Sequence, residues 1–222
     1  MFPNWEEDQT SKNVIYVELR RAIIMRHLTP GVRLDVEGLA LQYKTSVTPV
    51  RDALQMLSQD GLVNIKPRSG YFVARTTLKQ LRDMLDLRHI LEMAAVDRAV
   101  IKISPEQLSE LKAVHAGYTG DDDESYDRYT DENKRFHYLL AKASGNFELS
   151  QLMGRLHDRL APFMVMRHGG RNQEATHLRI IDALEKHDVE TAREAMLDDI
   201  ERSHDSILDK VLAEEAENLH VS

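Results

Sequence analysis

Four polar side chains in the carboxy-terminal part of the chain stand at positions where apolar residues are expected. Asn133 and His137 are four residues apart, so they share one face of a predicted helix. His177 and Asp199 each fall on the apolar stripe of another predicted helix. A buried carboxylate without a partner is costly, so Asp199 needs one. Nitrogen and oxygen ligands from three helices can surround one divalent ion such as zinc, nickel or manganese, but a buried Asp–His pair without metal would satisfy the same physics.

The elements that must position these residues are helices, because apolar residues recur at helical spacing through nearly all of residues 78–222. Ser104-Pro105 is a capped helix start, and Gly145-Asn146 is a break between helices. We expect an all-α bundle of about six helices, with a kink or interruption at Pro162. The predicted helices cover residues 81–101, a segment starting at 104, then 126–143, 147–167, 173–186 and 189–213.

A second group of residues, near the amino terminus, is suited to binding phosphate. Lys66 and Arg68 stand at the tip of a predicted β-hairpin whose short apolar strands are residues 62–65 and 71–73. Gly70 lies at the end of the turn between them. Cations at such a tip would lie along the phosphates of a nucleic-acid duplex.

Two predicted helices separated by a tight turn come before this hairpin. Residues 36–43 form the first, and the second starts near Thr48, where Pro49 suits a first helical turn. Apolar positions bury one face of the second helix, which leaves Arg51 and Gln55 able to enter a major groove. Helix, turn, helix and basic hairpin together predict a winged helix-turn-helix that binds DNA. A winged helix used only for protein contacts is the alternative.

Residues 14–75 resemble the amino-terminal domain of the GntR family of bacterial transcription regulators. The matching residues are the run Thr48-Pro49-Val50-Arg51-Asp52-Ala53-Leu54, followed by Gly61-Leu62 and Gly70. The resemblance implies that Arg51 contacts DNA and that the wing near Arg68 and Gly70 reaches the minor groove or the backbone. Members of the family commonly carry an arginine where this chain has Val47. One expected DNA contact is therefore missing, and the operator sequence cannot be borrowed from the family.

Residues 78–208 resemble the FCD effector domain of the FadR subgroup of that family. The matching residues are Arg88-x-x-Leu91-Glu92-x-x-Ala95, Asn133-x-x-Phe136-His137, Ala143-Ser144-Gly145-Asn146 and His177-x-x-Ile180-x-x-Ala183-Leu184, with Asp188 and Ala192 following. In many members an aspartate and three histidines bind a metal. His137 and His177 match this set, whereas Asn133 replaces the aspartate and Asp199 replaces the last histidine. An amide oxygen can still ligate and Asp199 restores the negative charge, so the resemblance implies a divalent metal ion.

The resemblance further implies that a small organic acid binds in the same cavity. Arg88 and Arg159 are the candidates to bind its carboxylate, because a guanidinium makes two parallel charge-assisted hydrogen bonds to that group. A surface salt bridge is the alternative role for each arginine. His157 and His168 are not included in the predicted site, because single histidines on helices more often have structural roles.

Composition and charge bound the class of protein. The length of 222 residues suits two domains, which we place at residues 1–77 and 78–222. Residues 1–78 carry a net charge of +2 and the rest a net charge of −10, so basic character is confined to the predicted DNA-binding part. The absence of cysteine, of an apolar run of about 18 residues and of a signal-peptide pattern leads us to expect a cytoplasmic protein without membrane contact.

These observations predict a ligand-responsive transcription repressor. We expect it to bind a pseudo-palindromic, double-stranded DNA operator as a homodimer, with a small carboxylate as effector. One alternative is a sensor in which the metal ion itself is the signal. Another is a metal-dependent enzyme, but the sequence offers no nucleophile motif and no spare glutamate to act as general base. We therefore expect no enzymatic activity.

Overall fold

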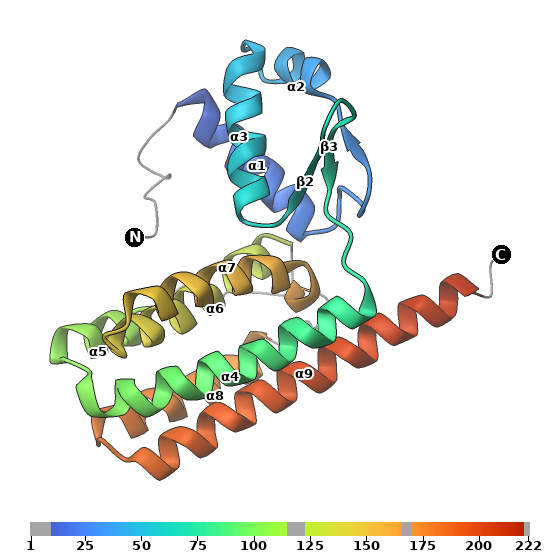
Figure 1. The fold of residues 1–222 in the computed structure, drawn as a ribbon. Helices are drawn as coiled ribbons and strands as arrows, with labels where there is room; N and C mark the ends of the chain where they lie inside the picture. Colours follow the sequence, from blue (N-terminus) through green and yellow to red (C-terminus); the bar gives the residue numbers. More distant parts are fainter. Residues whose placement is uncertain (1–9, 115–122, 166–169, 220–222) are drawn as a thin grey trace. The chain divides into compact units, whose positions relative to one another are not determined.

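The chain divides into two compact units, Met1–Thr77 and Leu78–Ser222. The computed structural model describes residues 10–114, 123–165 and 170–219 (Figure 1). The elements of the first unit are α1 (Ser11–Ile24), β1 (Arg33–Leu34), α2 (Val36–Gln42), α3 (Val47–Gln59), β2 (Val63–Lys66) and β3 (Gly70–Val73). Those of the second unit are α4 (Leu78–Lys102), α5 (Pro105–Lys112), α6 (Asp123–Ala143), α7 (Phe147–Met164), α8 (Gly170–Glu185) and α9 (Val189–Leu219).

The helices of the first unit enclose one apolar core together with a small sheet. Ile15, Leu19 and Ile23 recur at every fourth position of α1, so their side chains share its buried face. Most of the other core residues come from α3 and from the strands. They are Val50, Ala53, Leu54 and Leu57 on α3, and Leu34, Val63 and Val73 on the strands. The predicted pair of helices, α2 and α3, is confirmed. Helix α1 and strand β1 were not predicted, although the spacing on α1 is a readable helical signal.

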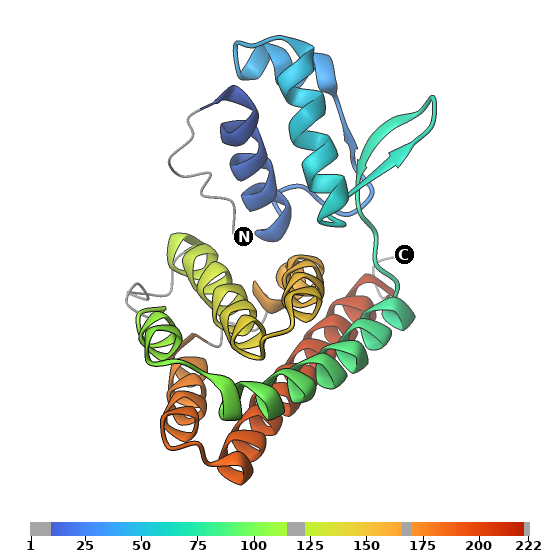
Figure 2. The same cartoon turned by 60° about the vertical axis from the view of Figure 1, so that its left-hand side comes forward.

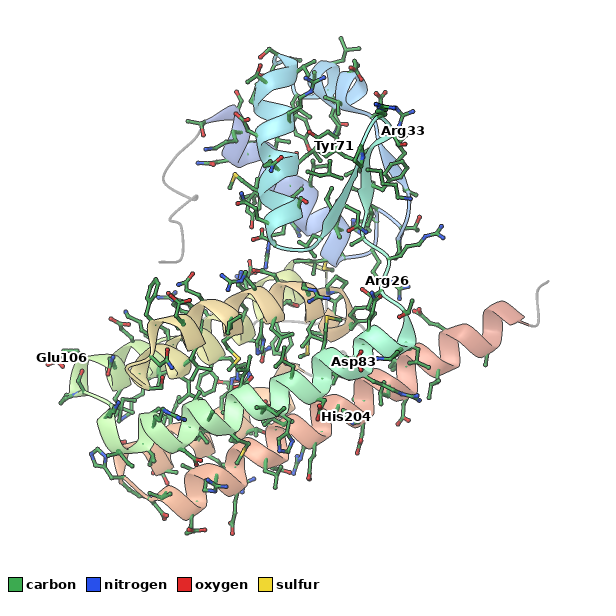
Figure 3. All side chains as sticks on the ribbon, in the orientation of Figure 1. Arg26, Arg33, Tyr71, Asp83, Glu106 and His204 are labelled. Carbon is green, nitrogen blue, oxygen red and sulfur yellow. The ribbon has the colours of Figure 1, made fainter. Side chains whose placement is uncertain are left out.

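The sheet is antiparallel with strand order β1-β3-β2. The hairpin of β2 and β3 is the predicted wing, and it closes at the pair Lys66 and Gly70. In the turn, Arg68 and Gly70 both have positive φ angles, of 62° and 106°. The second conformation suits glycine, which has no Cβ. Strand β1 extends the hairpin on the other side of β3, where Arg33 and Tyr71 mark the neighbouring strands in Figure 3.

The second unit is an all-helical bundle in which α4 packs against α6, α7, α8 and α9. Figures 1 and 2 both show α4 and α9 lying side by side along their length. The fold class is therefore as predicted, a winged helix-turn-helix followed by about six helices. No helix within the described ranges combines the length and the apolar character needed to span a bilayer.

Two of the predicted helix boundaries follow from side-chain capping. The Ser104 hydroxyl accepts a hydrogen bond from the backbone N–H of Gln107 (3.2 Å), and the Gln107 side chain accepts one from the Ser104 N–H (3.0 Å). This capping box starts α5. Gly145, with a φ angle of 75°, ends α6, and Asn146 caps α7 by accepting from the N–H of Leu149 (3.1 Å).

The boundaries around the fourth predicted helix differ from expectation. Helix α7 continues through Pro162 without interruption and ends at Met164 rather than near residue 167. Helix α8 begins at Gly170, three residues before the predicted start, and residues 166–169 lie outside the described ranges. Helix α9 continues to Leu219, beyond the predicted end near residue 213. None of these differences moves a predicted site residue out of its helix.

Candidate functional site

A buried polar cluster lies in the core of the second unit, where five helices contribute to it. Its members are Arg88 and Glu92 on α4, His137 on α6, His157 on α7, His177 on α8 and Asp199 on α9. Each of these residues is at most 3% exposed. Helical periodicity explains the burial, because every member occupies a position on the apolar face of its own helix. We call these six residues the buried cluster.

Glu92 lies at the centre of one half of the buried cluster. Its Oε2 lies 2.8 Å from Nδ1 of His137, and its Oε1 lies 2.9 Å from Nε2 of His157. The Arg88 Nε donates to the same Oε1 (3.2 Å). Burial by itself raises the pKa of Glu92, but His137, His157 and Arg88 together hold that pKa well below its usual range. Glu92 is therefore an ionised acceptor, and both ring nitrogens that face it must carry protons.

His157, which was not included in the predicted site, belongs to this half of the cluster. Burial and the neighbouring His137 lower the pKa of His157 to about 4, despite the hydrogen bond to Glu92. The imidazole is therefore neutral near pH 7. Its ring stacks on that of His137 with centroids 4.6 Å apart. The signal that could have found it is its place on the apolar face of α7 beside Met153 and Leu160. His168 lies outside the described residues.

Arg88 joins the two halves of the buried cluster. Its Nη2 donates to Oδ2 of Asp199 (2.8 Å) and lies 3.4 Å from Nε2 of His137. Through Nε it also contacts Glu92, so one guanidinium links the carboxylates of α4 and α9. The remaining nitrogen, Nη1, is buried and makes no hydrogen bond within the described residues. A buried donor without an acceptor is unfavourable, so an anion that reached Nη1 would be stabilised there.

The other half of the cluster has the geometry of a metal site. One ligand atom each from His137, His177 and Asp199 lies within 4.8 Å of the other two. His137 Nε2 is 3.6 Å from Asp199 Oδ2, and His177 Nε2 is 3.8 Å from Asp199 Oδ1. A tetrahedral ion bound at its usual ligand distances brings ligand atoms to about 3.4 Å from one another. The three residues therefore fit a divalent ion after small side-chain movements.

The residues around these three also suit metal binding. Because His137 donates its Nδ1–H to Glu92, the neutral form of His137 leaves Nε2 as the ligand atom. The imidazole of His177 stacks on Phe136, with centroids 3.8 Å apart, which fixes the plane of the ring. Glu92, His137 and His157 also lie close enough to hold an ion. However, direct hydrogen bonds already join them, so they serve better as support for the metal site than as ligands.

The other predicted residues of this site fall in two different environments. Asn133 is buried one turn before His137 on α6, on the face that its spacing predicted. Arg159 is exposed on α7, whereas Arg88 is 1% exposed. The structure therefore groups Arg88, and not Arg159, with the candidate ligands. Glu92 was quoted in the family pattern, but its central role in holding two histidines was not predicted.

The candidate nucleic-acid interface lies in the first unit, on α3. Arg51 and Gln55 are exposed one turn apart, while Val50 and Leu54 are fully buried. The helix therefore presents the two polar side chains outward, as predicted. Val47, at the place where an arginine is common in the family, is partly buried and packs against the apolar core. Its side chain contributes to folding and cannot provide the missing hydrogen bond to DNA.

The remaining predicted DNA contacts lie at the start of α3 and on the wing. Thr48 is exposed and Pro49 is partly buried in the first turn of α3. Lys66 and Arg68 are exposed, and the Lys66 Nζ lies 4.6 Å from the centroid of the Phe72 ring. This contact is a cation–π interaction, which holds the lysine against the hairpin.

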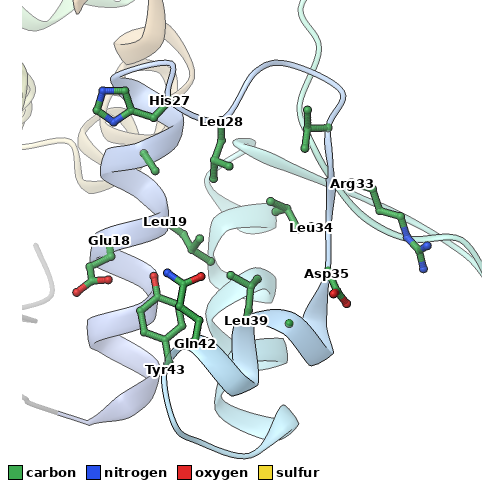
Figure 4. A pocket seen from close by; sticks show the side chains of 13 residues that line it. Glu18, Leu19, His27, Leu28, Arg33, Leu34, Asp35, Leu39, Gln42 and Tyr43 are labelled. Atoms are coloured by element: carbon green, nitrogen blue, oxygen red, sulfur yellow. The ribbon is translucent and has the colours of Figure 1, made fainter.

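A separate hollow of about 440 Å³ lies in the first unit beside α1 and α2 (Figure 4). Its walls are mainly apolar, with Leu19, Leu28 and Leu39 among them. The phenol of Tyr43 lies beside Glu18, and burial, followed by the hydrogen bond to Glu18, raises the pKa of Tyr43 to about 12. None of the predicted DNA contacts lines this hollow.

A winged helix-turn-helix followed by an all-helical unit that buries a polar cluster is the architecture of a DNA-binding transcription regulator. The chain belongs to the GntR family of bacterial regulatory proteins. The model of that family matches residues 11–73, and the model of the FCD domain matches residues 83–202. Both resemblances predicted from the sequence are therefore confirmed.

Relatives and solved structures agree with this assignment. The chain is 29% identical over 214 residues to an HTH-type transcriptional regulator in an unstable DNA locus of Streptomyces ambofaciens, covering 87% of this chain and 86% of that protein. It is 25% identical over 206 residues to the HTH-type transcriptional repressor RspR of Escherichia coli, covering 87% of each. The solved structure of E. coli McbR/YncC superposes with a TM-score of 0.72 at 22% identity, over 91% of this chain and 99% of that one. This structural likeness supports the fold.

Proposed function

We propose that this chain is a ligand-responsive transcription repressor. It binds a pseudo-palindromic operator as a homodimer, and a small carboxylate bound at the buried cluster controls its affinity for DNA. The single observation that carries the sensing role concerns the buried guanidinium of Arg88. Its Nη1 makes no hydrogen bond within the described residues, and it lies beside three candidate metal ligands. Similarity to a protein named as a repressor, RspR, supports the repressor sense. We expect the protein to act in the cytoplasm, where its operator is.

The chemistry of Arg88 supports a carboxylate as the effector. Its Nη1 needs an acceptor, and a carboxylate can accept from two guanidinium nitrogens at once. The cluster is enclosed by five helices, so the ligand must be small. Arg159 is exposed, so it is neither a buried donor that needs an acceptor nor part of an enclosed site. We therefore place the effector at Arg88 alone.

A divalent ion is the second component of the proposed sensor. His137, His177 and Asp199 would hold it, and Asn133, one helical turn from His137, is the candidate for a fourth ligand. Two nitrogen and two oxygen donors select poorly among zinc, nickel and manganese. When bound, the ion supplies positive charge that attracts a carboxylate oxygen. Glu92 keeps His137 in the tautomer that ligation requires.

The DNA-binding half of the proposal rests on exposed side chains of α3 and the wing. Arg51 and Gln55 would enter the major groove, with Thr48 and Pro49 at the start of the helix close to the backbone. Lys66 and Arg68 would contact phosphates or the minor groove, and Gly70 permits the tight turn that carries them. Two copies of the chain would double these contacts. A homodimer thus compensates for the small positive charge of a single DNA-binding unit.

Selection of genomic DNA with the purified protein tests this proposal. We expect recovery of an inverted repeat, followed by loss of binding when one small carboxylate, suggested by the genes beside the recovered sites, is added with metal present. No enriched sequence at low ionic strength would contradict the operator. Enrichment without a response to any carboxylate would contradict the effector and leave the operator in place.

The donor set of the buried cluster also supports a second candidate function, a sensor of the metal ion itself. In that case a chelator alone would change operator affinity, and carboxylates would add nothing. Measuring operator binding in the presence of a chelator, of Zn²⁺, and of Zn²⁺ with a carboxylate separates the two functions. In both, the cluster binds its ligand without turnover.

A further inference from the structure

The guanidinium of Arg88 lies next to the atoms that would bind a metal ion. Its Nη2 lies 2.8 Å from Asp199 Oδ2 and 3.4 Å from His137 Nε2, which are two of the candidate ligand atoms. Those two atoms lie 3.6 Å from each other. The three atoms thus form a compact triangle with the cationic nitrogen at one corner.

An ion bound by both ligand atoms would therefore lie close to the guanidinium. At ligand distances of about 2.1 Å, it would be within about 4 Å of Nη2 wherever it sat. Two cations at that separation repel strongly in a site that excludes water. The Oδ2 atom of Asp199 would also have to serve the ion and the guanidinium together. Arg88 in its observed position and a divalent ion on Asp199 are therefore unfavourable together.

We propose that Arg88 is an internal cation that competes with the metal ion for Asp199, and that metal binding turns its guanidinium toward the effector. This inference rests on the proposed metal site. Without the ion, Arg88 neutralises Asp199 and keeps a buried carboxylate paired. With the ion bound, Asp199 becomes a ligand and Arg88 loses that partner.

The contacts of Arg88 make such a movement feasible. Its Nε remains 3.2 Å from Glu92, so the guanidinium can rotate about this anchor without losing every carboxylate. Its Nη1 already has no acceptor within the described residues, and release from Asp199 would leave Nη2 in the same condition. Two neighbouring N–H donors without acceptors match one carboxylate. Metal and carboxylate should therefore bind with positive coupling.

Titration with Zn²⁺ alone tests the competition. We would measure Zn²⁺ affinity by competition with a chromophoric chelator for the full-length wild type, Arg88→Gln and Arg88→Lys. We expect Arg88→Gln to bind Zn²⁺ at least about tenfold more tightly, because the repelling charge is gone and two carboxylates need a cation. Arg88→Lys keeps the charge and should stay near the wild type. Arg159→Gln, which removes an exposed arginine of the same unit, is the matched control and should not differ from the wild type.

Equal or weaker Zn²⁺ binding by a folded Arg88→Gln chain would overturn the competition. If that variant does not fold, the wild type still decides the question through its arginine Nε–Hε signals in ¹⁵N NMR spectra. We expect the signal of Arg88, assigned by its absence in Arg88→Lys, to shift when Zn²⁺ is added, and an unchanged signal would overturn the proposal. Absence of Zn²⁺ binding in all chains would also overturn it. That last result would leave operator binding, which is measured separately, as the surviving part of the proposed function.

Discussion

Glu92 and Asp199 divide the tasks of the buried cluster between two carboxylates. Glu92 accepts hydrogen bonds from two histidines and fixes their orientation, while Asp199 is paired with Arg88 and faces His137 and His177. Because Glu92 uses both oxygens on protein donors, it has little capacity left for a ligand. Among the described residues, Asp199 has one close partner, Arg88, and this partner can be exchanged for another cation. We therefore propose that Asp199, rather than Glu92, is the carboxylate that ligates the metal ion.

Replacement of one candidate ligand should separate sensing from DNA binding. We expect His177→Gln to lose Zn²⁺ binding and the response to carboxylate, with operator affinity unchanged within about twofold, because the site lies in the other unit. Calorimetry with Zn²⁺ and fluorescence anisotropy on operator DNA would measure the two effects. His204→Gln, a change at a partly exposed histidine of α9, is the control (Figure 3). A retained carboxylate response in His177→Gln would remove the site from the proposed function.

Two exposed arginines of the DNA-binding unit, Arg51 and Arg68, should differ in the part of the DNA that they contact. We expect Arg51→Ala to cost about 1 to 3 kcal/mol on the operator and much less on an unrelated duplex, because it is proposed to contact a base. Arg68→Ala should weaken binding to both duplexes alike and lower the salt dependence by about one ion, because it is proposed to contact phosphate. Anisotropy titrations at several salt concentrations measure both quantities. An equal loss on both duplexes for Arg51→Ala would reduce its role to a phosphate contact.

At the scale of single elements, α3 and α4 place their polar site residues differently: α3 has its core residues and its proposed DNA contacts on different faces, whereas α4 has its core and cluster residues on one buried face. Helix α3 buries Val50 and Leu54 in the core and presents Arg51 outward. Helix α4 buries an apolar stripe that continues through Arg88 and Glu92, so its polar site residues are inside the bundle. The buried Arg88–Glu92 pair of α4 is stabilised by hydrogen bonds with side chains of α6, α7 and α9.

The capping box of α5 offers a test of local stability in the second unit. We expect Ser104→Ala to lower the free energy of unfolding by about 1 kcal/mol, because the N–H of Gln107 loses its acceptor. Ser109→Ala, an exposed position on the same helix, should change stability by less than about 0.5 kcal/mol. Urea unfolding followed by circular dichroism measures both. Equal effects for the two variants would show that the cap contributes nothing to the stability of this unit.

At the scale of the whole molecule, charge is distributed unequally between the two units. The first carries a net charge of +2 and the second a net charge of −10, which together give −8. The acidic unit repels phosphate, so only the basic face of the first unit should approach DNA. We expect a single such face to bind weakly, and this expectation is one reason for proposing a dimer with two recognition helices on one operator.

The spacing of operator half-sites should follow from this proposed dimer. Inserting about 5 base pairs between the half-sites places them on opposite faces of the duplex, and we expect specific binding to be lost. Inserting about 10 base pairs restores the face but separates the sites by a further helical turn, so recovery should be at most partial. Gel retardation of these duplexes, with the natural operator as reference, measures the effect. Full binding to the 5-base-pair insertion would contradict a rigid two-fold dimer on DNA.

The sequence by itself determined the fold class and much of the helix order, because these depend on local signals. The Thr48-to-Leu54 run, the Ser104 capping box and the Gly145 break each act within a few residues, so they can be read without tertiary structure. The outward direction of Arg51 follows equally from the apolar spacing of α3.

Only the tertiary structure decided how the polar residues of the bundle are partnered. Arg88 and Asp199 are separated by 111 positions, and the contact between Glu92 and His157 spans 65. Periodicity places each of these side chains on the inner face of its helix but does not say which helices meet there. Exposure of Arg159 and burial of His157, two positions apart on α7, were decided in the same way. The physical reason is that helix packing sets which inner faces share one core, and this depends on all the helices together.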